Sequence, residues 1–282
     1  MAEAITKARI ARDLRENLGL APGDRIAVHS SMKSLGRVEG GPIAVIEALI
    51  EAVGGPDAGT VLMPCFTGAL DVCDVRHSRS RVGLVSETFR TYPGVRLSPN
   101  HTHRVAVYGR DAQAIADCHV GTSPLGTGSP FHELTRRGGS VIHIGCDFRS
   151  SSLIHVAEHL FPLPYNDAQI TFPGYDKEVT LIREDGTRIV CPPLDNPGDS
   201  QGFLVLQERM DRYGLIRHGP VGEAQCMRVR GLDVLAMAMD MMREDPAALL
   251  CRAPGCQVCR AKRRLAEAWQ SGRADRSGPP AP

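Results

Sequence analysis

The chain has 282 residues, of which 42% are hydrophobic and 23% charged, and its formal net charge is +1 at pH 7. This composition is typical of a globular protein, and the charge disfavours a binding surface for nucleic acid or for an anionic membrane. No apolar run approaches the roughly 20 residues that cross a bilayer. The N-terminal segment is polar and amphipathic, unlike a secretory signal. Nine cysteines, an odd number in a large chain, favour the reducing cytoplasm over a disulfide framework.

Apolar strands alternate with amphipathic helices along the chain, which indicates an α/β fold around a mostly buried central sheet. Helices are predicted over residues 4–20, 42–53, 86–92, 152–160, 200–213 and 232–243. Short apolar strands are predicted over residues 25–29, 60–64, 104–108 and 140–145.

Residues 171–193 differ from this pattern, because they are rich in β-branched side chains and contain the turn signal Asp185-Gly186. They predict a small antiparallel β-hairpin subdomain. We expect a single domain over residues 1–264 and a polar, partly disordered tail over residues 265–282.

A loop of small polar residues follows the first predicted strand. Backbone N–H groups at the carboxyl end of a strand favour anions, so the loop is a candidate phosphate site, although the Walker spacing is absent. The alternatives are a polar surface turn, or a nucleophile formed by His29 beside two serines. The loop residues are Ser30, Ser31, Lys33, Ser34, Leu35 and Gly36.

Three titratable residues share one face of the predicted helix over residues 152–160, because His155, Glu158 and His159 lie at positions i, i+3 and i+4. As H-x-x-E-H the pattern matches the inverted zinc-peptidase signature, in which two histidines bind zinc and the glutamate is the general base. A second interpretation needs only His155, as a general base near pH 7. The third is a half-buried helix start.

Several further polar residues are candidates for binding. Thr102 lies in a histidine-rich loop at residues 100–103, and Ser129 precedes Pro130 as a predicted helix N-cap, where an anion is favoured. Three aspartates follow predicted strands, and together they form a negative pocket for a cationic substrate if they meet around His155. These aspartates are Asp71, Asp195 and Asp199.

Near the C-terminus, Cys251-x4-Cys256-x2-Cys259 has metal-ligand spacing and predicts a structural zinc site. A fourth ligand is not defined by the sequence, and Cys191, Cys226 and His218 are candidates. Similar spacing occurs in plant-type iron–sulfur proteins.

Taken in order, eight segments of residues 4–259 resemble the aminoglycoside 3-N-acetyltransferases, also called antibiotic N-acetyltransferases. The resemblance implies a three-layer α/β/α sandwich, unrelated in fold to the GNAT acetyltransferases. It also implies transfer of acetyl from acetyl-CoA to the 3-amino group of an aminoglycoside, which confers antibiotic resistance. The segments are VHSSMKSLGRVEGGP, GTVLMPCFTG, RVGLVSETFR, NHTHRVAVYG, LGTGSP, VIHIGCDFRSSSLIHVAEHL, HGPVGEA and GCQVC.

The resemblance also implies roles for individual residues. His155 matches the family's catalytic histidine, and Asp195 best matches the carboxylate that supports it. The acceptor amine is expected to bind Asp71, Glu158, Asp195 and Asp199. The acetyl-CoA site is expected to contain Ser30, Ser31, Lys33, Ser34, Leu35, Gly36, Thr102 and Ser129.

The chain departs from the family pattern where HPTHS is replaced by NHTHR, since Arg104 adds a positive charge near a site for cations. Two alternatives stay open: an acyltransferase that acts on another amine, and a zinc peptidase that uses His155, Glu158 and His159. We expect a cytoplasmic monomer or homodimer without nucleic-acid or membrane partners.

Overall fold

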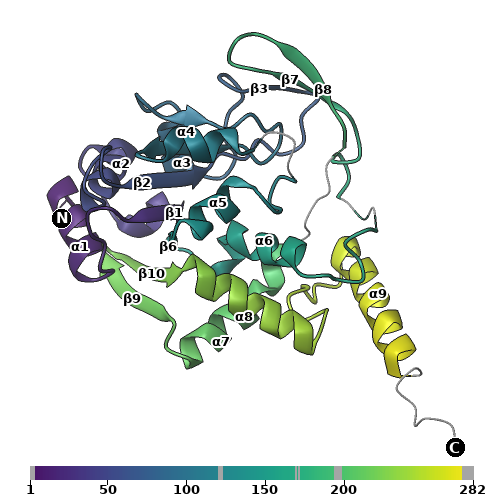
Figure 1. The fold of residues 1–282 in the computed structure, drawn as a ribbon. Coiled ribbons are helices and arrows are strands. Elements are labelled where there is room, and N and C mark those ends of the chain that lie inside the picture. Colours follow the sequence, from purple (N-terminus) through teal and green to yellow (C-terminus); the bar gives the residue numbers. More distant parts are fainter. Residues whose placement is uncertain (1–3, 120–122, 169, 171, 194–198, 275–282) are drawn as a thin grey trace, which may run out of the picture.

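The computed structural model describes residues 4–119, 123–168, 170, 172–193 and 199–274. A seven-stranded mixed sheet forms the centre of the molecule (Figure 1). β1 pairs in parallel with β2 and β6, and the outer strands are antiparallel to their neighbours. Across the sheet the order is β4 (Arg96–Leu97), β5 (Val105–Gly109), β2 (Thr60–Pro64), β1 (Arg25–Ser30), β6 (Ser140–Ile144), β10 (Ala224–Arg230) and β9 (Ile216–Val221).

Helices cover both faces of the sheet, which confirms the predicted α/β/α layers. Alternate residues of β1 show why: Ile26 and Val28 pack into one apolar core, and Ala27 packs into the other. The first core contains α1 (Lys7–Glu16), α2 (Gly41–Ala52) and α3 (Leu84–Arg90). The second contains α4 (Ala112–Asp117), α5 (Pro130–Arg136), α6 (Ser152–Leu160), α7 (Leu204–Arg212), α8 (Gly231–Glu244) and α9 (Gln257–Ala274).

A second, smaller sheet lies apart from the central one (Figure 1). β7 (Val179–Ile182) and β8 (Arg188–Cys191) form the expected antiparallel hairpin. β3 (Val72–Asp74) adds to β7 in parallel, so this sheet is mixed rather than purely antiparallel.

The β9–β10 hairpin and α9 are among the elements that the sequence prediction did not contain. β9 and β10 form a hairpin whose two-residue turn begins at Gly222, with φ of +60°, as a type II′ turn requires. Pro220 is tolerated in β9 because β9 is an edge strand. α9 continues to Ala274, although residues from 265 onward were expected to be a polar tail.

Three short 3₁₀ helices complete the elements that matter for the site: η1 (Met32–Leu35), η2 (Phe148–Ser150) and η3 (Ser200–Phe203). Among the residues that the structure describes, no helix has the length and apolar character that a membrane crossing requires.

Candidate active site

A cavity of about 500 Å³ opens beyond the carboxyl ends of the parallel strands. His29 and Ser30 line it from β1, and Pro64 lines it from β2. The segment that follows β6 contributes residues 149–152 and then His155 from α6. This is the place where open α/β sheets bind ligands.

His155 and Glu158 form a buried pair on one face of α6. The distance from His155 Nδ1 to Glu158 Oε2 is 2.6 Å, and the two residues are only 8% and 5% exposed. The ring of Phe203 packs edge-on against the imidazole, with ring centroids 4.7 Å apart. Because Nδ1 is bonded to the carboxylate, Nε2 is the ring nitrogen available to a substrate.

This arrangement suits a general base, since the carboxylate fixes the imidazole tautomer and stabilises the imidazolium. The sequence indicated Asp195 for that position, but Asp195 lies outside the described residues. Glu158, which the sequence assigned to the acceptor amine, makes the contact to His155 instead.

His159 does not join His155 in a metal site. Its Nε2 lies 3.3 Å from Ser123 Oγ, and Glu158 is already bonded to His155. Within the described ranges, the one close group of three or more metal-ligating side chains is formed by cysteines elsewhere. The H-x-x-E-H spacing therefore reflects the His155–Glu158 pair and does not mark a peptidase zinc site.

Two other histidines line the cavity, and no carboxylate among the described residues is bonded to either of them. Burial, reinforced by neighbouring histidines, lowers the pKa of His103 to about 3 and also holds the pKa of His29 well below its usual value. His29 Nε2 accepts a weak hydrogen bond from the backbone N–H of Ser152 at 3.4 Å. Both rings are therefore neutral at physiological pH, and His29 is not placed to activate a serine.

The positive charge at the cavity comes from Arg81 and Arg149, which the sequence analysis did not single out. Arg149 is bonded to the carboxylate of Asp147, with its Nη2 2.6 Å from Oδ2. Of the described residues that line the cavity, none is a carboxylate. The cavity is thus suited to an anionic group such as a phosphate.

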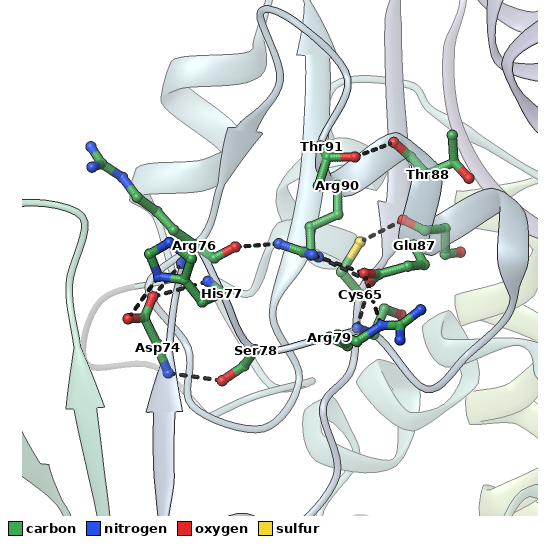
Figure 2. A network of polar contacts seen from close by, with 12 residues as sticks. Cys65, Asp74, Arg76, His77, Ser78, Arg79, Glu87, Thr88, Arg90 and Thr91 are labelled. Atoms are coloured by element: carbon green, nitrogen blue, oxygen red, sulfur yellow. Dashed lines mark hydrogen bonds and ion pairs between the residues drawn. The ribbon is translucent and has the colours of Figure 1, made fainter.

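A polar network joins the loop after β3, which leads to Arg81, to the helix α3 (Figure 2). Arg90 of α3 bonds Glu87 and also donates to the backbone carbonyl of Arg76. Oε2 of Glu87, which accepts from Arg90 Nε, also accepts from the Ser80 backbone N–H at 2.7 Å. Arg81 then donates its own N–H to the Phe66 carbonyl at 2.8 Å, which fixes it beside β2.

Comparison with known proteins agrees with these features. The family model of the aminoglycoside 3-N-acetyltransferases matches residues 27–243. Aminoglycoside N(3)-acetyltransferase IV of Salmonella sp is 30% identical over 238 residues, which are 83% of this chain and 86% of that protein. The chain belongs to the aminoglycoside 3-N-acetyltransferase family.

Solved structures support the same assignment. The acetyltransferase AAC(3)-IVa, as a histidine-to-alanine variant in complex with a gentamicin, is 30% identical with a TM-score of 0.80. The match covers 94% of this chain and 99% of that one. AAC-IIIb with bound CoASH is 26% identical with a TM-score of 0.73, over 86% of this chain and 97% of that one.

In this acetyltransferase the polar loop expected to bind acetyl-CoA forms the end of β1 and then η1. Ser30 lines the cavity, Lys33 is exposed, and Ser34 Oγ donates to Ser31 Oγ at 2.9 Å. The Leu35 side chain is fully buried in the apolar core of the α1–α3 face, so only its backbone can reach a bound cofactor. Gly36 has a φ of +85°, which favours glycine.

Thr102, Ser129 and Arg104 do not line the cavity. The Thr102 hydroxyl lies 2.9 Å from His103 Nδ1, and Ser129 is fully buried at the N-cap of α5, without the expected capping bond from its side chain. Arg104 is also fully buried, and it donates to backbone carbonyls of residues 74–78. It therefore adds no charge to the acceptor side of the site.

The two described aspartates that were expected to bind the amine point elsewhere. The Asp71 side chain is 84% exposed and forms an ion pair with Lys177. Asp199 caps η3 through Oδ1, which accepts from the Gln201 N–H at 2.8 Å, and its Oδ2 lies 3.6 Å from Cys251 Sγ. Neither lines the cavity.

The three cysteines predicted to bind metal do come together. The Sγ atoms of Cys251, Cys256 and Cys259 all lie within 4.8 Å of one another, and the residues are 4%, 9% and 0% exposed. Cys259 lies in the first turn of α9 and Cys256 just before it. The other proposed thiol ligands lie elsewhere, Cys191 in β8 and Cys226 in β10, and His218 is paired with Asp211.

Proposed function

We propose that this acetyltransferase transfers acetyl from acetyl-CoA to the 3-amino group of an aminoglycoside, and thereby confers antibiotic resistance. The observation that carries the proposal is the His155–Glu158 pair, with 2.6 Å between Nδ1 and Oε2, at a cavity in a chain of this family. Relatives were solved with CoASH and with a gentamicin. All nine cysteines are unbridged, which is consistent with the cytoplasm.

The chemistry is a direct transfer. His155 Nε2 takes one proton from the substrate ammonium, which frees the nitrogen lone pair to attack the thioester carbonyl carbon, and the Nδ1–H bond to Glu158 stabilises the imidazolium. The C–S bond then breaks, the attacking nitrogen gives up its second proton to form the neutral amide, and the leaving CoA thiolate takes up that proton. No acyl-enzyme forms in this sequence. A stable acetyl adduct, found by mass spectrometry of the protein with acetyl-CoA alone, would overturn direct transfer.

Acetyl-CoA binds, in this proposal, at the positively charged side of the cavity. Ser30 reaches the cavity from β1, Lys33 is exposed on η1, and Arg81 lines the cavity from the loop before α3. Arginine and lysine side chains are the usual partners of phosphate groups. We assign the phosphates and the pantetheine arm to this region.

The proposal also includes a structural zinc ion. The three clustered cysteines Cys251, Cys256 and Cys259 are the thiolate ligands that zinc prefers, and the burial of all three suits a structural role rather than a catalytic one.

The decisive experiment measures thiol release from acetyl-CoA against a panel of aminoglycosides and simple amines. We expect turnover with aminoglycosides that carry a free 3-amino group, and none with a 3-N-acetylated control. His155→Ala should lose roughly 100-fold or more in kcat while CoA still stabilises the protein thermally. Turnover restricted to simple amines would instead identify an acyltransferase of another pathway.

A further inference from the structure

The cysteine cluster has the dimensions of a tetrahedral metal site that still needs one ligand. With Zn–S bonds of about 2.3 Å, two sulfurs of such a site lie about 3.8 Å apart. The three Sγ atoms lie within 4.8 Å of one another, so small side-chain rotations bring them to that spacing. Cys256 and Cys259 stand at the N-terminus of the 18-residue helix α9, where the helix dipole stabilises thiolates.

Asp199 lies beside this cluster of three cysteines, close to one of them, and a turn of its side chain toward the other two sulfurs would supply the fourth ligand. For Zn–S of about 2.3 Å and Zn–O of about 2.0–2.2 Å, a tetrahedral site separates sulfur from oxygen by about 3.6 Å. Asp199 Oδ2 lies 3.6 Å from Cys251 Sγ. Its other oxygen, Oδ1, accepts from Gln201 N–H, so Oδ2 is the oxygen left to face Cys251. In addition, the Asp199 backbone N–H donates to Cys259 Sγ.

We propose that Asp199 completes a closed zinc site with Cys251, Cys256 and Cys259, and that this site holds the wall of the active-site cavity in place. The second part rests on the proposed function, because its effect is measured at His155. A site with four protein ligands leaves no open position for substrate or water, so the metal positions residues and does not react.

The wall in question is η3, which begins one residue after Asp199. Its first residue, Ser200, lines the cavity and donates Oγ to the Arg149 carbonyl at 2.5 Å. Its last residue, Phe203, packs against the His155 ring. Between them Gly202 lies on the 249–251 segment, so closely that a Cβ there would be 2.3 Å from the Leu249 carbonyl oxygen. The contact thus joins η3, which follows Asp199, to the segment that ends at Cys251. A metal bound by both Asp199 and Cys251 would hold these two segments together.

The first measurement is zinc content, by elemental analysis of the purified protein and of variants. We expect one zinc per chain in the wild type and at least a tenfold weaker zinc affinity in Asp199→Ala, in competition with a chromophoric chelator. The matched controls are Asp185→Ala, which removes an aspartate that caps an exposed turn, and Cys191→Ser, which removes a cysteine outside the cluster. Both controls should bind zinc as the wild type does.

The variant Asp199→Cys distinguishes the role of Asp199 as a zinc ligand from its role as the N-cap of η3. Cysteine is a better zinc ligand and a poorer cap, so this variant should bind zinc at least as tightly as the wild type. An Asp199→Cys protein that loses zinc as Asp199→Ala does would overturn the ligand assignment. So would a wild type that stays free of zinc after refolding with the metal, or an Asp199→Ala variant with unchanged affinity. Cobalt-loaded wild type should show thiolate-to-cobalt charge-transfer absorption, which gives a test that needs no variant.

The positioning role is tested by kinetics. Removal of zinc from the wild type should lower kcat about tenfold or more, with recovery on adding zinc, while KM for acetyl-CoA changes less than twofold. Full activity of a protein shown to be zinc-free would refute the positioning role. Tight zinc binding in a protein that acetylates no aminoglycoside would refute the proposed function and leave the metal site intact.

Discussion

Glu158 is predicted to act on the proton of His155 and not on the acceptor amine. Its Oε2 lies 2.6 Å from His155 Nδ1, in a pair that is about nine-tenths buried or more. A hydrogen bond to a charged group contributes about 1.5–3 kcal/mol. Since the imidazolium forms only during the reaction, Glu158→Ala should lower kcat by about 10- to 150-fold and change KM for either substrate little.

Glu158→Gln should be worse than Glu158→Ala. The glutamine amide can donate to Nδ1, which would move the ring proton to Nε2 and block the nitrogen that must accept from the amine. An enforced wrong tautomer costs up to about 10⁴ in kcat in an established case.

The assay is steady-state thiol release with each substrate varied in turn. Glu244→Gln serves as the control, because that carboxylate bonds Arg209 at the surface. A rise in KM for the amine at unchanged kcat would show that Glu158 binds the acceptor, and it would refute the base-and-carboxylate assignment.

Three further predictions concern the surroundings of this pair. Lys33→Ala and Arg81→Ala should each raise KM for acetyl-CoA about two- to fivefold, because an exposed ion pair with a phosphate contributes little free energy. KM for the amine should not change. The control is Arg96→Ala, which removes an exposed arginine on β4. Phe203→Leu should lower kcat about tenfold at unchanged zinc content, because it loosens the His155 ring. Burial lowers the pKa of His143 from 6.5 to about 3, so the unfolded state binds the extra proton below pH 6.5 and stability falls as the pH falls. In His143→Phe the free energy of unfolding should therefore fall less steeply with falling pH than in the wild type, by about 1.4 kcal/mol per pH unit between pH 6 and about 4. Urea denaturation at several pH values measures this slope. An unchanged slope would contradict the explanation.

The central strands could be predicted because they are apolar on both faces. Each of β1, β2 and β6 is a short run of buried residues, which stands out from the surrounding sequence. The β9–β10 hairpin was missed because β9 is an edge strand whose exposed positions carry Arg217 and His218. α9 was missed for a related reason: its sequence is mostly polar, and only a narrow stripe that includes Ala266 reaches the core.

In the site, the local relations were accessible from sequence and the distant ones were not. His155 and Glu158 share a helical face, so their contact follows from spacing alone. The approach of Phe203 to His155, or of Asp199 to Cys251, joins residues about 50 positions apart and leaves no periodic signal. Arg81 lies within a family-like segment, RVGLVSETFR, which was the available clue, because its place at the cavity beside Ser30 depends on the fold.

The acidic residues show most clearly why residue type does not determine role. Glu158, Asp71 and Asp199 were all predicted to hold a cationic substrate, since a carboxylate is the natural partner of an ammonium. Each is engaged elsewhere: Glu158 by His155, Asp71 by Lys177, and Asp199 by the η3 N-terminus and the cysteine cluster. A carboxylate can bind a substrate only if it is not already bonded to a neighbouring donor or part of a metal site. Which of these it meets depends on the direction of the side chain. Direction is set by which elements the fold brings together, so the described part of the cavity presents arginines and histidines where the sequence predicted aspartates.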